Sequence, residues 1–354
     1  MSVFGRAEQS GRRGLDLARE LKERLDRIRH PLHIQPSQLD PNPVGVPAEG
    51  EGGWRKCSAN PLLGGSDGVL FDVAVIAVGG VFRMWSSWRT TGAIAGSVSI
   101  DGVHWSRPRV VLEPGRQGWM AKVNRPAVVR TQDGRWHMWF TGQTEKRSSI
   151  GYAQSDDGWS WDLMTESPVL EAGCEWEKAA VMAPCVLVDQ DGTLKMWYAA
   201  GEQYEPDAIG LATSTDGINW TKHGSNPIFE PRPDLQWERA KVTAPSVVRI
   251  DDWYYLFYIG FEDIGTARIG VARSRDGIRD WQRMIANPIV APERRAWDRT
   301  ATYRPAVVHH AGRWYLWYNG RSGRREQIGL ATLDAADPSF GAGWDGNATD
   351  ESQT

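Results

Sequence analysis

The chain has 354 residues, a formal net charge of −3 and 41% hydrophobic residues. This length permits one large all-β domain or two domains of ordinary size, and the hydrophobic content is sufficient for a packed core. The near-neutral charge excludes the strongly basic composition that is typical of proteins binding nucleic acids or anionic membranes.

The cysteines and the apolar runs bear on location and cofactors. Cys57, Cys174 and Cys185 make an odd count and lack the spacing of a metal site. No run approaches transmembrane length, and residues 1–30 lack the apolar core of a signal peptide. There is no Gly-rich phosphate loop and no nucleophile elbow. We therefore expect a cytoplasmic protein with no metal ion and no other cofactor.

The first predicted element is an amphipathic helix over residues 14–29. The stretch GLDLARELKERLDRIR places Leu and Ile on one helical face and mixed charges on the other. The Pro- and Gly-rich stretch that begins at Pro31 predicts an extended linker, so residues 1–50 form a helix and a linker. The helix packs on the main domain, mediates a homo-oligomer or is a solvated arm. The sequence leaves these alternatives open.

Three sequence markers recur in the rest of the chain. The first is a short strand around Pro, RPAVV, APCVL, APSVV and RPAVV, with the prolines at 126, 184, 245 and 305. The second is an aromatic strand such as GRWYLWYNG, and the third is a run such as IGLATSTDGINW. A weaker early copy, FDVAVIAVGGVFRMWSSW, carries Asp72-Val73 where the others carry Arg-Pro or Ala-Pro. Such periodicity indicates a repeat architecture.

Each repeat contains three apolar or alternating runs and a fourth run such as NPIFEP, with an Asp-Gly turn before the fourth. Four strands in each of five units of about 60 residues predict an all-β, five-bladed β-propeller over residues 51–338. The last unit ends at IGLATLD without a fourth strand, and WRKCSANPLLGG at residues 54–65 matches the missing one. We therefore predict closure by an N-terminal strand, and a disordered tail over residues 339–354.

The repeat also predicts which loops share a face. When the strands are lettered a to d from the channel outward, the b–c turns and the d–a connections lie on one face. This face collects the longer, charged segments. Loops held by a rigid scaffold are where function is expected. The carboxylates of its b–c turns are Glu145, Glu202, Glu205, Glu262 and Asp263.

Asp72 and the repeated Pro-strand pattern resemble the five-bladed propeller glycosidases, over roughly residues 54–335. These include arabinanases, xylosidases and invertase-type enzymes, and the pattern is similar to the related β-mannoside phosphorylases as well. In the arabinanase type, the resemblance implies that an Asp at the position of Asp72 acts as general base. It also implies acids at two later positions, where this chain has Ala183 and Thr243. Two of the three expected carboxylates are therefore absent, and so is the Arg-Asp-Pro type segment of the phosphorylases.

Glycoside hydrolysis generally needs a second carboxyl group, which acts as the acid. Glu202, in YAAGEQYEP, is a candidate because it is unique to its repeat. Glu177 and Glu238 are further candidates, but they follow Trp in the repeated heads WEK and WER, and Asp298 follows Trp in WDR. The alternative for these three is a structural ion pair with a neighbouring blade. The alternative for Asp72 is the neutralisation of an arginine across the channel.

Basic and hydrogen-bonding side chains gather near the starts of the inner strands. Arginine suits bidentate recognition of carboxylate or phosphate, so these side chains predict an anionic group on the ligand, with internal ion pairing as the alternative. The Trp series 119, 176, 237 and 297 could stack on a sugar or serve packing. The predicted substrate ligands are Arg125, Arg304, Asn124, Tyr303, Lys241, Asp298 and Trp88.

These features favour a carbohydrate-active propeller that cleaves or transfers a glycosidic bond of a small, anionic sugar, with Asp72 as base. The missing family acids favour an alternative, a degenerate glycosidase scaffold that binds a sugar or anionic metabolite or runs a non-hydrolytic reaction in a small-molecule pathway. A third hypothesis is an interaction propeller that assembles through its N-terminal helix. The expected partner is a small molecule, with no nucleic acid and no membrane.

Overall fold

The computed structural model describes residues 53–65, 68–115, 118–339 and 341–346. The predicted helix over residues 14–29 and the predicted boundary after residue 50 lie outside these ranges. The regular secondary structure of the described residues is almost entirely β, with two short 3-10 helices, η3 (Glu175–Glu177) and η4 (Gln236–Glu238). No helix in these ranges is long and apolar enough to cross a membrane.

Consecutive strands pair antiparallel into successive four-stranded groups, which we number in chain order. The first is β2 (Leu70–Val78), β3 (Val81–Trp88), β4 (Ala93–Ser99) and β5 (Arg109–Leu112). The second is β6 (Lys122–Arg130), β7 (Trp136–Gln143), β8 (Ser148–Ser155) and β9 (Asp162–Leu163). The third is β10 (Ala180–Val188), β11 (Leu194–Gly201), β12 (Pro206–Ser214) and β13 (Thr221–Lys222). A parallel pairing of Ala180 with Ser148 joins the second and third groups into one sheet.

The last two sheets follow the same plan. The fourth is β14 (Lys241–Ile250), β15 (Trp253–Asp263), β16 (Thr266–Ser274) and β17 (Gln282–Arg283). The last is β18 (Ala301–His310), β19 (Arg313–Ser322), β20 (Arg325–Leu333) and β1 (Arg55–Lys56). Here β1 pairs antiparallel with β20, with Arg55 opposite Thr332. The prediction that an N-terminal strand completes the last sheet is confirmed.

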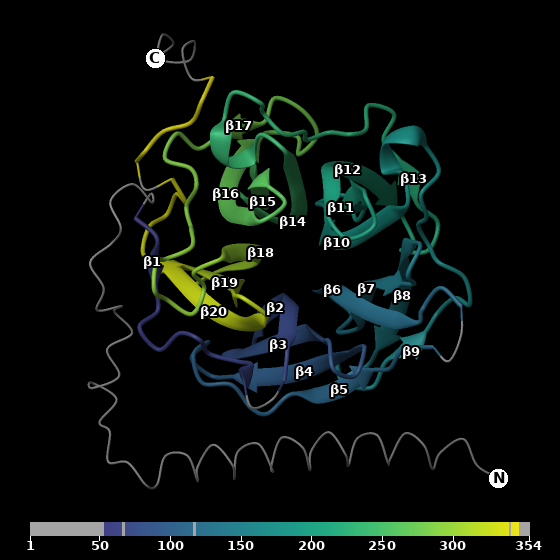
Figure 1. The fold of residues 1–354 in the computed structure, drawn as a ribbon. Coiled ribbons are helices and arrows are strands. Elements are labelled where there is room, and N and C mark those ends of the chain that lie inside the picture. Colours follow the sequence, from purple (N-terminus) through teal and green to yellow (C-terminus); the bar gives the residue numbers. More distant parts are fainter. Residues whose placement is uncertain (1–52, 66–67, 116–117, 340, 347–354) are drawn as a thin grey trace, which may run out of the picture. The chain divides into compact units, whose positions relative to one another are not determined.

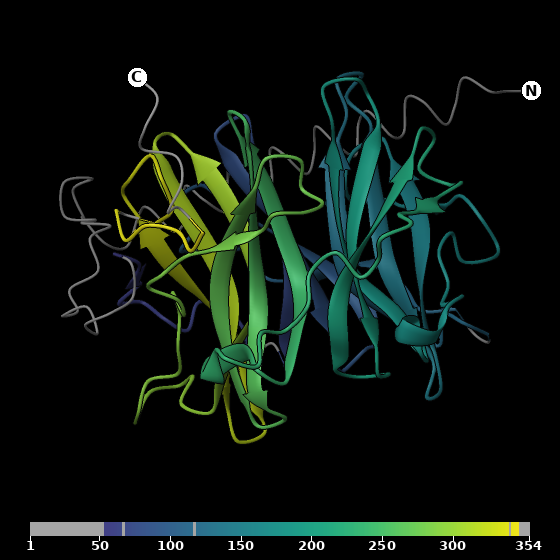
Figure 2. The same cartoon turned by 90° about the horizontal axis from the view of Figure 1, so that it is seen from above.

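The first strand of each sheet contacts the first strand of the next, and β18 contacts β2, so the series closes on itself. Figure 1 shows β2, β6, β10, β14 and β18 nearest one another, with the later strands of each sheet farther out. Figure 2, turned by 90°, shows the same strands from the side. A closed order of radial sheets is the arrangement of a β-propeller, which leaves few sheet edges unprotected.

Buried Trp side chains tie one sheet to the next. Each lies in the second strand of its sheet and donates its indole N–H to the glycine carbonyl of an Asp-Gly turn in the following sheet. The pairs are Trp85 with Gly158 at 3.1 Å, Trp139 with Gly217 at 2.9 Å, Trp197 with Gly277 at 2.9 Å and Trp317 with Gly102 at 3.0 Å. The repeated Asp-Gly turn therefore supplies an acceptor for a buried donor, as well as reversing the chain.

The Trp residues that precede the first strands pack on glycines of their own sheet. A Cβ added at Gly260 or Gly270 would lie 2.3 Å from the ring of Trp237. Trp119 and Trp297 meet glycines in the same way, at Gly142 and Gly320. These contacts match the packing alternative for this series, because the rings fill the space that these glycines leave open.

Replacing Gly260 with Ala should lower the free energy of unfolding by about 1–3 kcal/mol, because the added methyl group overpacks the Trp237 ring. Urea unfolding measures the change. Gly224→Ala is the matched control, since a Cβ there meets nothing within 4 Å. Equal stabilities for the two variants would contradict this account of the packing.

The segment 341–346 packs on the fourth sheet. Trp344 is only 4% exposed and pairs with Met284 through its backbone. Asp345 accepts a hydrogen bond from the Arg283 backbone N–H and forms an ion pair with Arg232. The prediction of a disordered tail from residue 339 is wrong for these residues, because Trp344 buries a large apolar side chain that has no counterpart in the repeats.

Candidate active site

Every first strand carries a β-bulge at the same place. Two residues of the first strand there face one residue of the second, as at Asp72-Val73 between Phe71 and Ala74. The first bulge residue has φ between 51° and 55°, a region that non-glycine residues seldom adopt. A bulge re-aims a side chain. We call the ring of these residues the channel mouth: Asp72, Arg125, Ala183, Ala244 and Arg304.

Side chains of the preceding sheet hold several of these bulges. The backbone N–H of Asp72 donates to Asn319 Oδ1 at 2.8 Å, and that of Arg125 donates to the Ser87 hydroxyl at 2.8 Å. The Ala183 N–H donates to the Thr141 hydroxyl at 3.0 Å. These hydrogen bonds satisfy the N–H groups of three of the five bulges and stabilise their unusual backbone.

Asp72 lies between two arginines. Its side chain is 3% exposed, and Oδ1 is 2.8 Å from Nε of Arg304. Oδ2 is 3.8 Å from Nε of Arg125 and accepts a hydrogen bond of 3.3 Å from the Ser87 hydroxyl. The carboxylate is therefore held from both neighbouring sheets, and its Oδ2 has the weaker contacts.

Each of the two arginines has an N–H donor that lacks a hydrogen-bond acceptor among the described residues. Arg125 Nη1 donates to Asn124 Oδ1 at 2.7 Å, but Arg125 Nε and Arg304 Nη1 are buried without a hydrogen-bond partner among the described residues. Burial and the neighbouring Arg304 lower the pKa of Arg125 to about 10. Buried donors without acceptors are unfavourable, so this side of the mouth is suited to an oxygen-rich ligand.

Tyr303 and Lys241 stand beside the same bulges. Burial, and then the negative charge of Glu326, raise the pKa of Tyr303 well above its usual range, so its hydroxyl remains a neutral donor. Lys241 Nζ is 2.8 Å from Asp207 Oδ1 and donates to the Glu205 carbonyl at 2.7 Å. Lys241 therefore holds the turn between β11 and β12.

Glu205, in that turn, is a further candidate site residue; it is one of the b–c turn carboxylates named from the sequence, but it was not chosen as the predicted acid. Burial raises the pKa of its carboxyl, while Arg304 and Arg125 act in the opposite direction. The arginines that flank Asp72 thus act on Glu205 as well. A sequence signal existed in Pro206, which restricts Glu205 to extended backbone at the start of a strand.

Glu202, the predicted acid from the same turn, points elsewhere. It is exposed, and Oε1 lies 3.0 Å from Nζ of Lys178, which also binds Asp207 at 2.6 Å. Trp88, at the end of β3, is half-buried beside Gly68, and its indole N–H is buried without a partner in the described part of the chain.

The carboxylates of the repeated heads are all fully buried in ion pairs. Each accepts hydrogen bonds from a basic residue of the outermost strand and from a Tyr of the second strand. Glu238 lies 2.6 Å from Arg283 Nε and 2.5 Å from the Tyr258 hydroxyl. The other two sets are Glu177 with Lys222 and Tyr198, and Asp298 with Lys56 and Tyr318. These contacts match the structural alternative, with one correction: the partners come from the same blade, not from a neighbouring one.

The described ranges contain no group of three or more His, Cys, Asp or Glu side chains arranged to hold a metal ion.

Comparison with known proteins shows which proteins this chain is similar to. The chain matches the Glycosyl hydrolases family 32 N-terminal domain over residues 76–242. It is 26% identical over 276 residues to an uncharacterized protein of Mycobacterium tuberculosis, covering 72% of this chain and 89% of that protein. It is 25% identical over 338 residues to a 1,2-β-oligomannan phosphorylase of Thermoanaerobacter, covering 87% of this chain and 100% of that protein.

Solved structures share the fold. One from the GH130 family of mannoside phosphorylases superposes with a TM-score of 0.63 at 16% identity, covering 82% of this chain and 96% of its own. A thermostable family-43 glycoside hydrolase superposes with a TM-score of 0.60 at 15% identity, covering 74% and 88%.

Proposed function

We propose that this chain, which has the fold of the glycosidase-like β-propeller superfamily, cleaves or transfers a glycosidic bond of a small sugar substrate at the channel mouth. One observation carries the proposal. Asp72 is buried between Arg125 and Arg304, and the charges of the same two arginines act on Glu205. Two carboxyl groups in different surroundings are what acid–base cleavage of a glycosidic bond requires.

Asp72 is the general base in this proposal. Arg304 holds Oδ1, so Oδ2 is the atom that takes a proton from an incoming water as the water oxygen attacks the anomeric carbon. Glu205, kept protonated to higher pH by burial, gives its proton to the leaving glycosidic oxygen as the bond from the anomeric carbon to that oxygen breaks. Ala183 and Thr243 stand at the positions where the family pattern has acids. In this proposal Glu205, a side chain from a turn, acts as the acid instead.

The hydrogen-bond donors of the channel mouth bind the substrate in this proposal. The spare N–H groups of Arg125 and Arg304 suit an anionic group on the sugar, and Tyr303 and Asn124 suit its hydroxyls. Lys241 contributes by fixing the turn that carries Glu205. Glu202, Glu177, Glu238 and Asp298 have structural roles in this proposal.

A second candidate is phosphorolysis, in which inorganic phosphate attacks the anomeric carbon in place of water. The spare arginine donors favour it, and a relative aligned over its full length is named a phosphorylase. Incubation with β-1,2-mannobiose, with and without phosphate, separates the candidates. Sugar 1-phosphate formed only with phosphate supports phosphorolysis, free sugar without phosphate supports hydrolysis, and binding without turnover supports the degenerate-scaffold alternative.

The proposal extends to the organisation of the chain. Residues 51–338 form five blades of four strands. This part of the proposal is supported by the five first strands, which contact one another in a closed order. Residues 1–50 form an amphipathic helix and a linker, through which the chain assembles as a homo-oligomer. The protein acts in the cytoplasm on a small molecule, without a cofactor.

Glu205→Gln should lower the rate by about 10²- to 10⁴-fold, because the proton donor is lost. In the wild-type protein, activity should fall as pH rises through the raised pKa of Glu205, since the deprotonated carboxyl cannot act as the acid. The pH–rate profile measures both effects, and the variant should lack this alkaline fall. Glu202→Gln, in the same turn, is the control. A Glu205→Gln variant with the wild-type rate and alkaline fall would rule out this role.

A further inference from the structure

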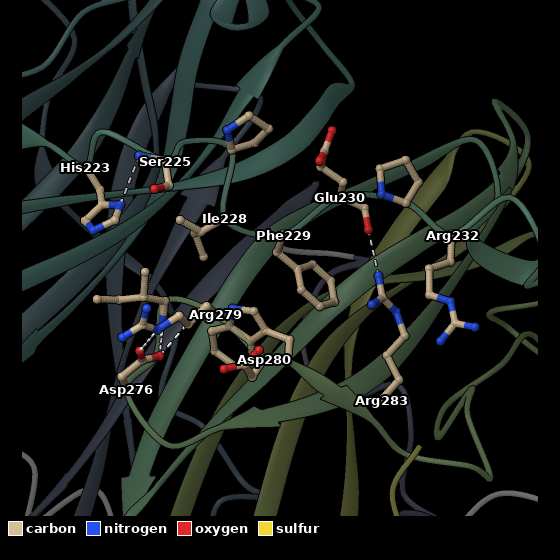
Figure 3. Close-up of a pocket in the computed structure, with 14 residues that line it drawn as sticks. His223, Ser225, Ile228, Phe229, Glu230, Arg232, Asp276, Arg279, Asp280 and Arg283 are labelled. Atoms are coloured by element: carbon tan, nitrogen blue, oxygen red, sulfur yellow. Dashed lines mark hydrogen bonds and ion pairs between the residues drawn. The ribbon is translucent and has the colours of Figure 1, made fainter. Parts of the chain in front are cut away.

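A groove lies between the outer edges of the third and fourth sheets. Its volume is about 600 Å³, within the range of small-molecule pockets. One wall is the segment after β13, which runs from His223 to Arg232. The other wall runs from Asp276 to Arg283, as Figure 3 shows. None of the lining residues belongs to the channel mouth, so the groove is a separate feature.

The Trp that lines this groove differs from its equivalents in the first and third sheets, whereas the indole N–H of Trp161, its equivalent in the second sheet, is also buried without a partner in the described part of the chain. In the first and third sheets, Trp105 and Trp220 donate their indole N–H to the turn glycine, at 3.0 Å and 2.9 Å. The turn of the fourth sheet, DGIRDW, is one residue longer than DGINW of the third, and Asp280 takes φ of 51°. Trp281 Nε1 is buried and has no hydrogen-bond partner in the described part of the chain.

The floor of the groove is aromatic and rigid. Phe229 is buried and meets Trp281 edge to face, with the ring centres 5.8 Å apart. The Arg283 guanidinium lies 4.2 Å from the centre of the Phe229 ring. It is fixed by Glu238 and by the Glu230 carbonyl, a contact drawn in Figure 3. The floor is therefore formed before any ligand binds.

The charged side chains of the groove that are not ion-paired with the described residues are negative. Its arginines are already held by carboxylates: Arg279 by Asp276, Arg232 by Asp345 and Arg283 by Glu238. The side chains of Glu230 and Asp280 are exposed, and neither makes an ion pair with the described residues. An anionic ligand would be repelled here, in contrast to the channel mouth.

We propose that this groove binds a neutral oligosaccharide at a site remote from the mouth. Trp281, which is half-buried and backed by the buried Phe229, offers apolar surface to a sugar ring. The exposed Glu230 and Asp280 carboxylates accept hydrogen bonds from its hydroxyl groups. Binding here requires no turnover at the mouth, so the site goes beyond the proposed reaction.

The test is fluorine NMR of protein labelled with 5-fluorotryptophan, titrated with β-1,2-mannotriose and separately with α-1,5-arabinotriose. Trp281→Phe assigns the resonance. The Trp281 resonance should shift with at least one saccharide, and the Trp220 resonance should not. Because the groove is separate, Asp72→Asn should leave this shift unchanged, whatever happens to catalysis.

The exposed carboxylates supply variants that should fold normally. The double variant Glu230→Gln, Asp280→Asn should weaken saccharide binding by roughly tenfold, equivalent to about 1.4 kcal/mol. Asp252→Asn, an exposed carboxylate of the same sheet outside the groove, should not change it. A Trp281 resonance unmoved by both saccharides at millimolar concentration would overturn the proposal. So would a shift produced only by a basic probe such as tetralysine.

Discussion

Asp72→Asn is expected to lower kcat by about 10²- to 10⁴-fold, the range associated with loss of a general base. The amide keeps an oxygen for the Arg304 contact but cannot take up the proton of an incoming water. The measurement is the initial rate on a saccharide that the wild-type protein cleaves, taken well below the melting temperature. Some loss of stability is also expected, since two buried arginines lose their counter-charge.

Asp298→Asn separates catalysis from stability. Asp298 is equally buried and ion-paired, with Lys56, but it lies outside the mouth. This variant should lose stability and keep its kcat. If the two variants lower kcat alike, Asp72 has only a structural role and the assignment of the base is wrong.

Glu238→Ala should lower the free energy of unfolding by about 3–5 kcal/mol, the range for removing one partner of a buried ion pair. The variant leaves the Arg283 guanidinium buried without its carboxylate and removes the acceptor of the Tyr258 hydroxyl. Chemical denaturation measures the loss. Activity at the mouth should be retained by the folded protein.

The double variant Glu238→Gln, Arg283→Met is the control, because it removes both charges and should recover part of the lost stability. Glu202→Gln breaks an exposed pair with Lys178 and should change stability little. A double variant no more stable than the single one would show that charge pairing is not what stabilises this head.

Much of the fold could be predicted because it is periodic. The Pro-strand, the aromatic strand and the Asp-Gly turn recur with the spacing of one sheet, and the missing last strand had an evident match at residues 54–65. The ion-pair partners of the carboxylates in the Trp-acid heads could also be identified from the sequence. Lys56, Lys222 and Arg283 each stand two positions after Trp54, Trp220 and Trp281, which identifies the partner of each buried carboxylate within its own blade.

The features of the fold and of the candidate site that could not be predicted do not recur with the repeat. Glu202 and Glu205 lie in one turn, yet Glu202 pairs with Lys178 while the charges of the mouth arginines act on Glu205, a difference that depends on the path of the turn. Trp344 has no counterpart in the repeats, so its burial against the fourth sheet was not recognised. Asp72 stood out for the opposite reason: it occupies a position at which the other sheets carry Arg or Ala.

A crystal structure of the Asp72→Asn variant with a saccharide that the wild-type protein cleaves would test the two-carboxyl site most directly. The account predicts the sugar in the channel mouth, with its glycosidic oxygen within hydrogen-bond distance of the Glu205 carboxyl and its anomeric carbon on the side of residue 72. A saccharide bound in the mouth with its glycosidic oxygen out of reach of Glu205, or bound only elsewhere on the propeller, would contradict it.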